Sequence, residues 1–428
     1  MAAIESNITN ASNPNYSVES VPLVTTTGAG GGGTGVAVLQ TVRAEAPMLS
    51  QQINGTQSTQ SYDQAFSQVA TVGQQIIAPS SGDLGSRLQD IFNSLSALSS
   101  QPQDPTSRTS VITALSQFAQ ADQNVSSSLY STALSQLDSV PPLISQINAA
   151  SAQIAQLNGQ ITAVKANNQS AVGLLDQRDA AVNQLASLIG ATADANGNVT
   201  VGGVPLVSGT TALTVSTTGA NVQLSVALAH GNLPLSLNQV GGQLGGIMSG
   251  AQSILNLQTQ VDSFARTVAN AFNAQSTSGY GLDGSTNNAL FTMSPAGGPI
   301  SINPALTTQN LPAASTAAGV PGDGSNATAI ANLANNPNLF PAYPNRTPIQ
   351  AFTQITTGFG SQVQQATEGQ TQAANSLQSL TALKSSITGV SLNQQLTQLI
   401  QYQNMLQASG RAVQTANDII TFLMQNIT

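Results

Sequence analysis

The last stretch of the chain, residues 391–428, carries the clearest hydrophobic pattern in the sequence. Alternating steps of four and three residues reach apolar side chains at every position except Gln403, Gly410 and Asn417. The apolar positions are Leu392, Leu396, Leu399, Leu406, Val413, Ile420, Met424 and Ile427. This spacing, without any proline, predicts one long helix with a coiled-coil seam. Because Arg411 and Asp418 are its only charged residues, we expect neighbours to cover it on several sides.

Similar seams predict further long helices between residues 49 and 189 and again in 244–273 and 348–387. The cleanest seams are Leu84 to Leu98, Val111 to Leu129 and Leu143 to Val164. Residues 101–105 end the first of these, and Thr106 or Ser107 is expected to cap the next helix. A shorter helix over 174–189 is closed by Gly190.

Three other regions have the composition of strands and turns. Residues 21–24 and 36–39 predict two short strands around the glycine run 28–35, which we interpret as a loop because no phosphate-binding Gly-Lys-Ser/Thr follows it. The segments 199–201, 206–207, 213–215 and 222–228 alternate with Gly-containing turns and predict a small antiparallel β unit. Residues 279–348 lack periodicity and are expected to form loops and short strands.

The fold predicted from these patterns is mainly α with inserted β: an elongated, multi-domain bundle of long helices with terminal coiled-coil helices and small antiparallel β excursions. Four regions are expected. They are a terminal helical domain (1–24 with 390–428), a helical bundle (25–190 with 244–278 and 349–389), the small β unit (191–243) and an inserted loop or β domain (279–348).

The composition narrows the function. Charged residues make up only 6% of the 428 residues, and 9 Lys and Arg against 17 Asp and Glu give a net charge of −8. The scarcity of positive charges therefore argues against nucleic acid as a partner. The chain has no cysteine and a single histidine, His230, which we assign to an exposed turn. No apolar run reaches the length of a membrane span, and the first residues lack the pattern of a cleavable secretory signal. We expect no cofactor, no metal site and no catalytic residue.

Several stretches together resemble the flagellar hook-associated protein 1 family, the first junction protein between hook and filament. Residues 13–17, with Pro14, Asn15 and Tyr16, are similar to the turn near the N-terminus of rod, hook and junction proteins. Residues 35–38, followed by Arg43, resemble the strand that comes next. The most discriminating match is Leu174, Leu175, Asp176, Gln177, Arg178 and Asp179, which resembles the Asp-Leu-Leu-Asp-Gln-Arg-Asp motif of the junction protein. Tyr402, Gln403 and residues 407–411 resemble the core of the C-terminal helix.

The chain departs from the family pattern in two places that matter. Asn15 stands where glycine is usual, and we expect asparagine's tolerance of left-handed backbone to accommodate the turn. The family also has a longer N-terminal helix before this turn than the dozen or so residues present here. We therefore expect either a start codon upstream of Met1 or a truncated chain.

The resemblance implies a structural adaptor. Such proteins leave the cell unfolded through the flagellar type III channel, without a cleaved signal, and assemble as a ring on the finished hook, outside the cell. The implied partners are other copies of the chain, the hook protein below, the next hook-associated protein above and an export chaperone. The implied assembly residues are the seam named above together with Tyr402. With so few charges, association is expected to depend weakly on salt.

Three alternatives remain open. One is another axial flagellar protein, such as a flagellin-like or hook-like chain, because these share the terminal helices. Another is a secreted adhesin, although no fixed-period repeat supports it. The third is a hydrolase that uses Asp176 and Asp179, which share a helix face; the neighbouring Arg178 instead favours a salt bridge.

Overall fold

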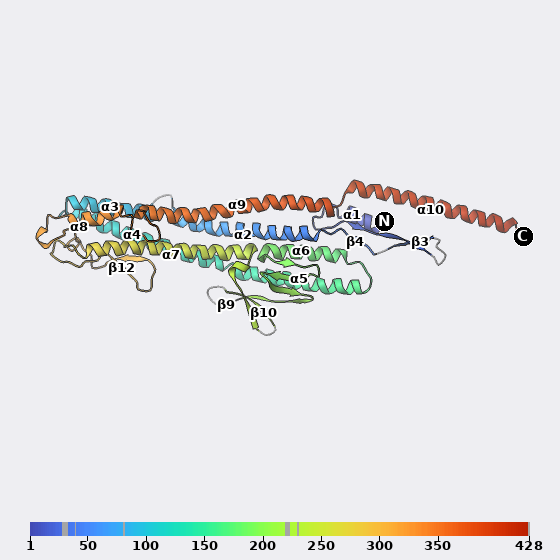
Figure 1. Cartoon of the computed structure of the whole chain (residues 1–428), viewed down its shortest axis with the longest axis horizontal. Coiled ribbons are helices and arrows are strands. Elements are labelled where there is room, and N and C mark those ends of the chain that lie inside the picture. The colour runs from blue at the N-terminus through green and yellow to red at the C-terminus, as the bar shows by residue number, and fades with distance from the viewer. Residues whose placement is uncertain (28–32, 39, 80–81, 219–222, 229–230, 427–428) are drawn as a thin grey trace. The chain divides into compact units, whose positions relative to one another are not determined.

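The computed structural model describes residues 1–27, 33–38, 40–79, 82–218, 223–228 and 231–426. His230, Ile427 and most of the glycine run, residues 28–32, lie outside this range. Long helices dominate the chain, and the sheets have two to four strands each, joined in antiparallel pairs (Figure 1). This confirms the prediction of a mainly α fold with small antiparallel β excursions.

The backbone contacts divide the chain into two compact units. The first unit comprises residues 1–61, 142–242 and 371–428, and the second comprises residues 62–141 and 243–370. Four of the described helices have residues in both: α2 (Pro47–Ile77), α5 (Val140–Ala166), α9 (Pro348–Thr388) and α7 (Gly242–Ser276), whose first residue, Gly242, belongs to the first unit. The four domain boundaries expected from composition remain a prediction.

The other helices of the first unit are α1 (Ala2–Thr9), α6 (Val172–Ile189) and α10 (Leu392–Asn426). Its strands are β1 (Glu19–Ser20), β2 (Leu23–Thr27), β3 (Gly33–Val38), β4 (Val42–Arg43), β5 (Thr192–Ala193), β6 (Val199–Val201), β7 (Val204–Ser208), β8 (Thr211–Ala212), β9 (Val215–Thr218), β10 (Gln223–Leu228) and β11 (Gly231–Leu235). The pairs β1–β4 and β2–β3 are separate two-stranded sheets, β5 to β8 form a meander, and β10 lies between β9 and β11. A short 3₁₀ turn, η1 (Leu237–Gln239), leads on to α7.

The helix core of the first unit follows the predicted seams. Ile147 and Ile154 of α5 are fully buried, as are Leu185 and Ile189 of α6. Gly190 closes α6 with φ of 76°, where an added Cβ would lie 2.8 Å from the Cα of Gly241. The left-handed cap expected from the sequence is therefore confirmed, and the close backbone approach also requires glycine.

Some strand boundaries differ from those predicted. Residues 213–214 lie between β8 and β9, not inside a strand, and β5 and β11 were not expected. Strands of two to five residues carry too few alternating positions to fix their ends from the sequence. Near the N-terminus, the strand predicted over residues 21–24 corresponds to β2, which begins at Leu23, after Pro22, because proline cannot donate to a ladder.

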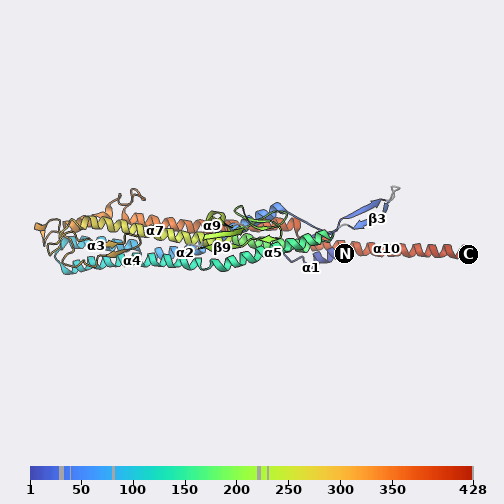
Figure 2. The same ribbon diagram turned by 90° about the horizontal axis from the view of Figure 1, so that it is seen from below.

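The second unit contains α3 (Leu84–Ser100), α4 (Pro105–Leu137), α7 (Gly242–Ser276), α8 (Ser325–Ala331), β12 (Phe291–Met293), β13 (Ile300–Ile302) and the 3₁₀ turns η2 (Ala317–Gly319) and η3 (Asn332–Asn335). The seam of α3 is buried, with Leu88 and Ile91 at 0% exposure, and it packs against α4. Figure 2 shows α3, α4 and α7 along one another in a second view. The rings of Phe118 and Phe272 both lie beside Phe291 of β12, with centroids 6.1 and 6.2 Å away.

Two local predictions for this unit were wrong. Asp104, not Thr106 or Ser107, caps α4: its carboxylate accepts from the Ser107 amide at 2.8 Å, and Pro105 occupies the first turn. Helix α8 lies in a region expected to hold only loops and strands. Its seven residues bury just Ala327 and Ile330 as apolar contacts, too few to produce a readable period.

Candidate assembly interface

Helix α10 presents its apolar side chains almost without cover from the rest of the chain. Gln395 is buried, Gln398 and Leu399 are half-buried, and every described side chain from residue 401 to residue 425 is exposed. Leu406 is 72% and Met424 69% exposed. Because large exposed apolar patches occur at protein interaction sites, this surface of α10 is the candidate assembly interface.

The predicted interface residues can now be placed. Those that are exposed on α10 are Leu392, Leu396, Tyr402, Leu406, Val413, Ile420 and Met424. Leu399 is half-buried, and Ile427 lies outside the described residues. Apolar side chains also occupy other faces of α10, since Ile400, Met405, Ile419, Phe422 and Leu423 are exposed as well. The sequence seam therefore identified one face of a helix that is apolar on more than one side.

The buried end of α10 packs against α1, as both views show (Figures 1 and 2). The contact includes a buried polar pair: the side-chain amide of Asn7 donates to the side-chain oxygen of Gln395 at 3.0 Å. Asn7 is 1% and Gln395 4% exposed. The hydrophobic pattern gave no indication of either residue, because both are polar.

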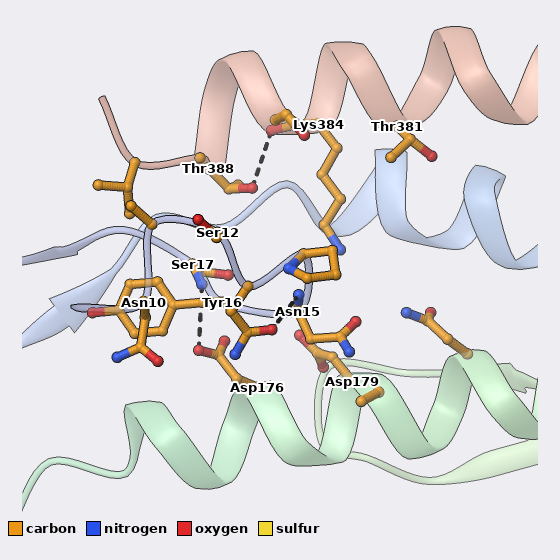
Figure 3. Close-up of a pocket in the computed structure, with 18 residues that line it drawn as sticks. Asn10, Ser12, Asn15, Tyr16, Ser17, Asp176, Asp179, Thr381, Lys384 and Thr388 are labelled. Carbon is orange, nitrogen blue, oxygen red and sulfur yellow. Dashed lines mark hydrogen bonds between the residues drawn. The ribbon is translucent and has the colours of Figure 1, made fainter. Parts of the chain in front are cut away.

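The N-terminal turn lies between α6 and the last turns of α9 (Figure 3). Asn13 makes the turn, accepting from the backbone N–H of Asn15 at 3.1 Å through its side-chain oxygen. Asn15 is not among the described residues with positive φ, so the expectation of a left-handed asparagine was wrong. Pro14 and Asn15 are exposed, whereas Tyr16 is half-buried and Ser17 is buried.

The motif of α6 is joined to the N-terminal segment by Arg43. The Arg43 guanidinium donates to Asp176 at 2.7 Å and contacts Asp179 at 2.9 Å and Glu45 at 3.1 Å. The Asp176 carboxylate also accepts from the Ser17 backbone N–H at 3.3 Å. The three resemblance motifs around residues 13–17, 35–43 and 174–179 thus meet at one site.

Burial and ion pairing act in opposite directions on the pKa values of Asp176 and Arg43. It raises the pKa of the Asp176 carboxyl, and the hydrogen bonds from Arg43 and Ser17 offset part of that increase. Burial alone would lower the pKa of Arg43, but the charge of Asp179 and the bond to Asp176 raise it overall. Arg43 therefore stays charged and keeps the two carboxylates together.

Arg178 has a different role from the one predicted. Its side chain is buried and turns to Asn158, whose oxygen accepts at 3.3 Å, and to the carbonyl of Ala195 at 3.4 Å. The ion-pair partner of the α6 carboxylates is Arg43, which lies 133 residues earlier in the chain than Asp176. Within the motif, Leu174, Leu175 and Asp179 are half-buried and Gln177 is exposed.

A polar cleft of about 220 Å³ opens beside the turn, lined by residues 10–17, the α6 carboxylates and the end of α9 (Figure 3). Asp176 and Asp179 both hold Arg43, an arrangement suited to structure and not to general acid–base chemistry. The described residues contain no group of three or more His, Cys, Asp or Glu that could hold a metal ion. Among the helices of the described ranges, none combines the length and apolarity needed to cross a bilayer.

The chain is similar in sequence to a known protein family and to named proteins. Residues 70–291 match the family described as the flagellar hook-associated protein FlgK helical domain. Flagellar hook-associated protein 1 of Salmonella typhimurium is 29% identical over 314 residues, which cover 68% of this chain and 56% of that protein. Its counterpart in Escherichia coli is 28% identical over 289 residues, covering 63% of this chain and 52% of that one. The chain thus matches about half the length of these relatives.

A solved structure shares the fold. The flagellar hook junction protein FlgK from Burkholderia pseudomallei superimposes with a TM-score of 0.67 over 79% of this chain and 100% of that one. The sequence identity is 15%, so the similarity concerns the fold alone.

Proposed function

This chain belongs to the FlgK family of flagellar hook-associated proteins, and on that premise we propose that it is a structural adaptor that joins hook to filament in the bacterial flagellum. The relatives carry the name of hook-associated protein 1, and the Burkholderia relative that of a hook junction protein. The proposed location is extracellular, at the hook–filament junction, with export through the flagellar secretion channel. The proposal assigns no catalytic role and no cofactor.

The observation that carries the proposal is the exposed apolar surface of α10. We propose that α10 packs against the terminal helices of other copies, so that the subunits close into a ring. A Leu or Met side chain that goes from fully exposed to fully buried gains about 1.5–3 kcal/mol. Several such residues per neighbour are needed to offset the entropy lost on association, and α10 exposes that many. The hook protein, the next hook-associated protein and an export chaperone are the further partners proposed.

Substitutions on this surface of α10 can disrupt assembly without disrupting folding. Leu406 is exposed and Leu399 half-buried, so a charge at these positions leaves the buried core of the first unit intact. In an assembly of helices, the same charge must be desolvated, at a cost of several kcal/mol.

The test compares two double variants in cells that lack the native gene. Leu399→Asp/Leu406→Asp is expected to be folded and secreted but absent from isolated hook–basal bodies, which then carry no filament. The matched control is Thr397→Asp/Asn404→Asp, which adds the same charges at the same spacing to exposed polar positions of α10. Normal incorporation of the Leu variant would refute the role of the α10 seam.

A further inference from the structure

Asn7 has a side chain whose hydrogen-bonding capacity is fully used inside the protein. Its amide nitrogen donates to Gln395 at 3.0 Å and to the Glu19 carbonyl at 2.9 Å. Its oxygen accepts from the Tyr16 hydroxyl and from the Glu19 backbone N–H, each at 2.8 Å. A buried amide with two donors and two acceptors, all of them paired, is held in one orientation.

The direction of these bonds follows from Tyr16. Its hydroxyl has one hydrogen, which goes to Asn7, so the Ser6 hydroxyl at 3.0 Å donates to the Tyr16 oxygen. Burial raises the pKa of Tyr16, and the charges of Glu19 and Asp176 raise it further, while the bond from Ser6 opposes this. The phenol therefore remains a donor throughout the neutral range.

The backbone of Glu19 links this amide to the rest of the first unit. Glu19 lies opposite Arg43 in the β1–β4 pair, and its N–H and C=O both point to the Asn7 amide instead. The Asn7 side chain thus occupies the free edge of β1 as a neighbouring strand would. Asn7 thus connects α10 to the backbone of Glu19 by hydrogen bonds; Glu19 pairs with Arg43 in the β1–β4 sheet, and the Arg43 guanidinium binds Asp176 of α6.

The apolar seam of α10 does not by itself determine the axial register between α10 and α1. Its apolar positions are similar side chains repeated every three or four residues, so shifts by one helical turn exchange one Leu or Met for another. A shift of that kind would separate Asn7 from Gln395 and leave buried amide groups unpaired, at a cost of about 1–3 kcal/mol for each group. A single buried polar residue is known to select register in coiled coils by this means.

We propose that Asn7 and Gln395 determine the axial register and the rotational setting of α10 against α1, so that α10 offers one fixed set of faces to other copies. The proposal rests on the proposed function for its biological meaning, but it concerns a contact within one chain.

The absence of cysteine from the sequence makes the contact measurable. Ala3→Cys in α1 is combined, one at a time, with cysteine at Leu396, Leu399, Tyr402 or Leu406 in the full chain. Crosslinking with a short bismaleimide at high dilution then reports intramolecular proximity. We expect one α10 position to dominate in the otherwise native chain. In an Asn7→Leu/Gln395→Leu background, its share should fall at least threefold as positions one turn away gain.

Gln89→Leu/Asn93→Leu is the matched control. It replaces an Asn–Gln hydrogen-bonded pair of similar length, 2.9 Å, on the exposed surface of α3, and should leave the crosslink pattern unchanged. Gln395→Met is the second variant if the double Leu variant fails to fold by far-UV circular dichroism. It removes the Gln395 partner and leaves the three other bonds of Asn7 available.

The register proposal is overturned if a single dominant crosslink persists in the folded Asn7→Leu/Gln395→Leu variant. If that variant does not fold, the same result in Gln395→Met overturns the proposal. That result leaves the adaptor function untouched. A spread pattern supports the register proposal even if Leu399→Asp/Leu406→Asp chains enter hooks normally, an outcome that would overturn the proposed function alone.

Discussion

Removing the Arg43 side chain should destabilise the first unit in a way that depends on pH. Arg43→Met leaves the carboxylates of Asp176 and Asp179 without their shared cation. The Arg43 and Asp176 side chains are 8% and 11% exposed, so their pair is effectively buried, whereas Asp179 is 39% exposed. Breaking a buried pair by removing one partner costs about 3–5 kcal/mol, and the exposed partner adds little. We expect a loss near the lower value, about 3 kcal/mol, at pH 8.

The pH dependence follows from the titration of Asp176. Its pKa is already raised by burial, and Arg43 is among the groups that hold the pKa down. Without Arg43 the folded-state pKa rises further above that of the unfolded chain. A folded state that keeps its proton while the unfolded state releases it loses stability as pH rises through that window. The loss of stability in Arg43→Met should therefore be smaller at pH 5 than at pH 8.

The assay is urea unfolding of the full chain, followed by far-UV circular dichroism at pH 5 and pH 8, with hydrogen exchange at α6 as a local probe. Arg87→Met is the control, because the Arg87–Asp90 pair on α3 is exposed and 3.7 Å long. That variant should lose less than about 0.5 kcal/mol at either pH. An Arg43→Met loss below about 1 kcal/mol, or one of equal size at both pH values, would refute the reasoning.

Two further predictions concern titration and salt. Burial raises the pKa of Asp122 to about 7, with Asp262 adding to the rise while the Ile300 N–H and Arg266 oppose it. The folded carboxyl keeps its proton to higher pH than the unfolded one, so Asp122 costs stability as pH rises from 4 to 7, by up to about 4 kcal/mol. Asp122→Asn should raise the unfolding midpoint at pH 8 and change it little at pH 4, as measured by calorimetry; an equal change at both would contradict this. Assembly through α10 should differ less than about twofold between 0.05 and 1 M NaCl, since apolar burial dominates; dissociation of isolated junctions by salt, measured by sedimentation, would count against it.

The long helices could be predicted because each repeats the same information many times. Leu84 to Leu98 gives five apolar positions in register, and burial of all five follows from one rule. The helix caps were predicted less accurately. Proline favours the first helical position, so Pro105 in the sequence already indicated that Asp104 is the N-cap of α4. Helix α8 is too short for any period to appear.

The sequence identified most residues of the site but not the contacts between them. The resemblance identified residues 13–17 and 174–179 and mentioned Arg43, but no local rule pairs Arg43 with a carboxylate 133 residues away. Arg178 is nearer in the sequence, but it lies two residues from Asp176 and one from Asp179. Residues at these spacings do not face each other on a helix, so its proximity in the sequence was misleading. Asn7 and Gln395 were missed for the same reason: their bond spans 388 residues and involves polar residues on helices that were judged by their apolar positions.

The buried polar residues of this chain distinguish between helix alignments that its apolar seams alone do not. With only 6% charged residues, most helix surfaces carry Gln, Asn, Ser, Thr and Ala, and the seams repeat similar Leu and Ile side chains. Such seams stabilise helix pairing but distinguish poorly between alignments one turn apart. In the second unit, Arg108 donates to the carbonyls of Pro102, Thr308 and Leu311 at 2.7–2.9 Å, a set of acceptors that exists in one alignment only. In the first unit, Arg43 likewise depends on one alignment, because it binds the carboxylates of Asp176 and Asp179 together. Because an unpaired buried charge costs more than a displaced methylene, these few contacts exclude alternative packings that the hydrophobic pattern permits.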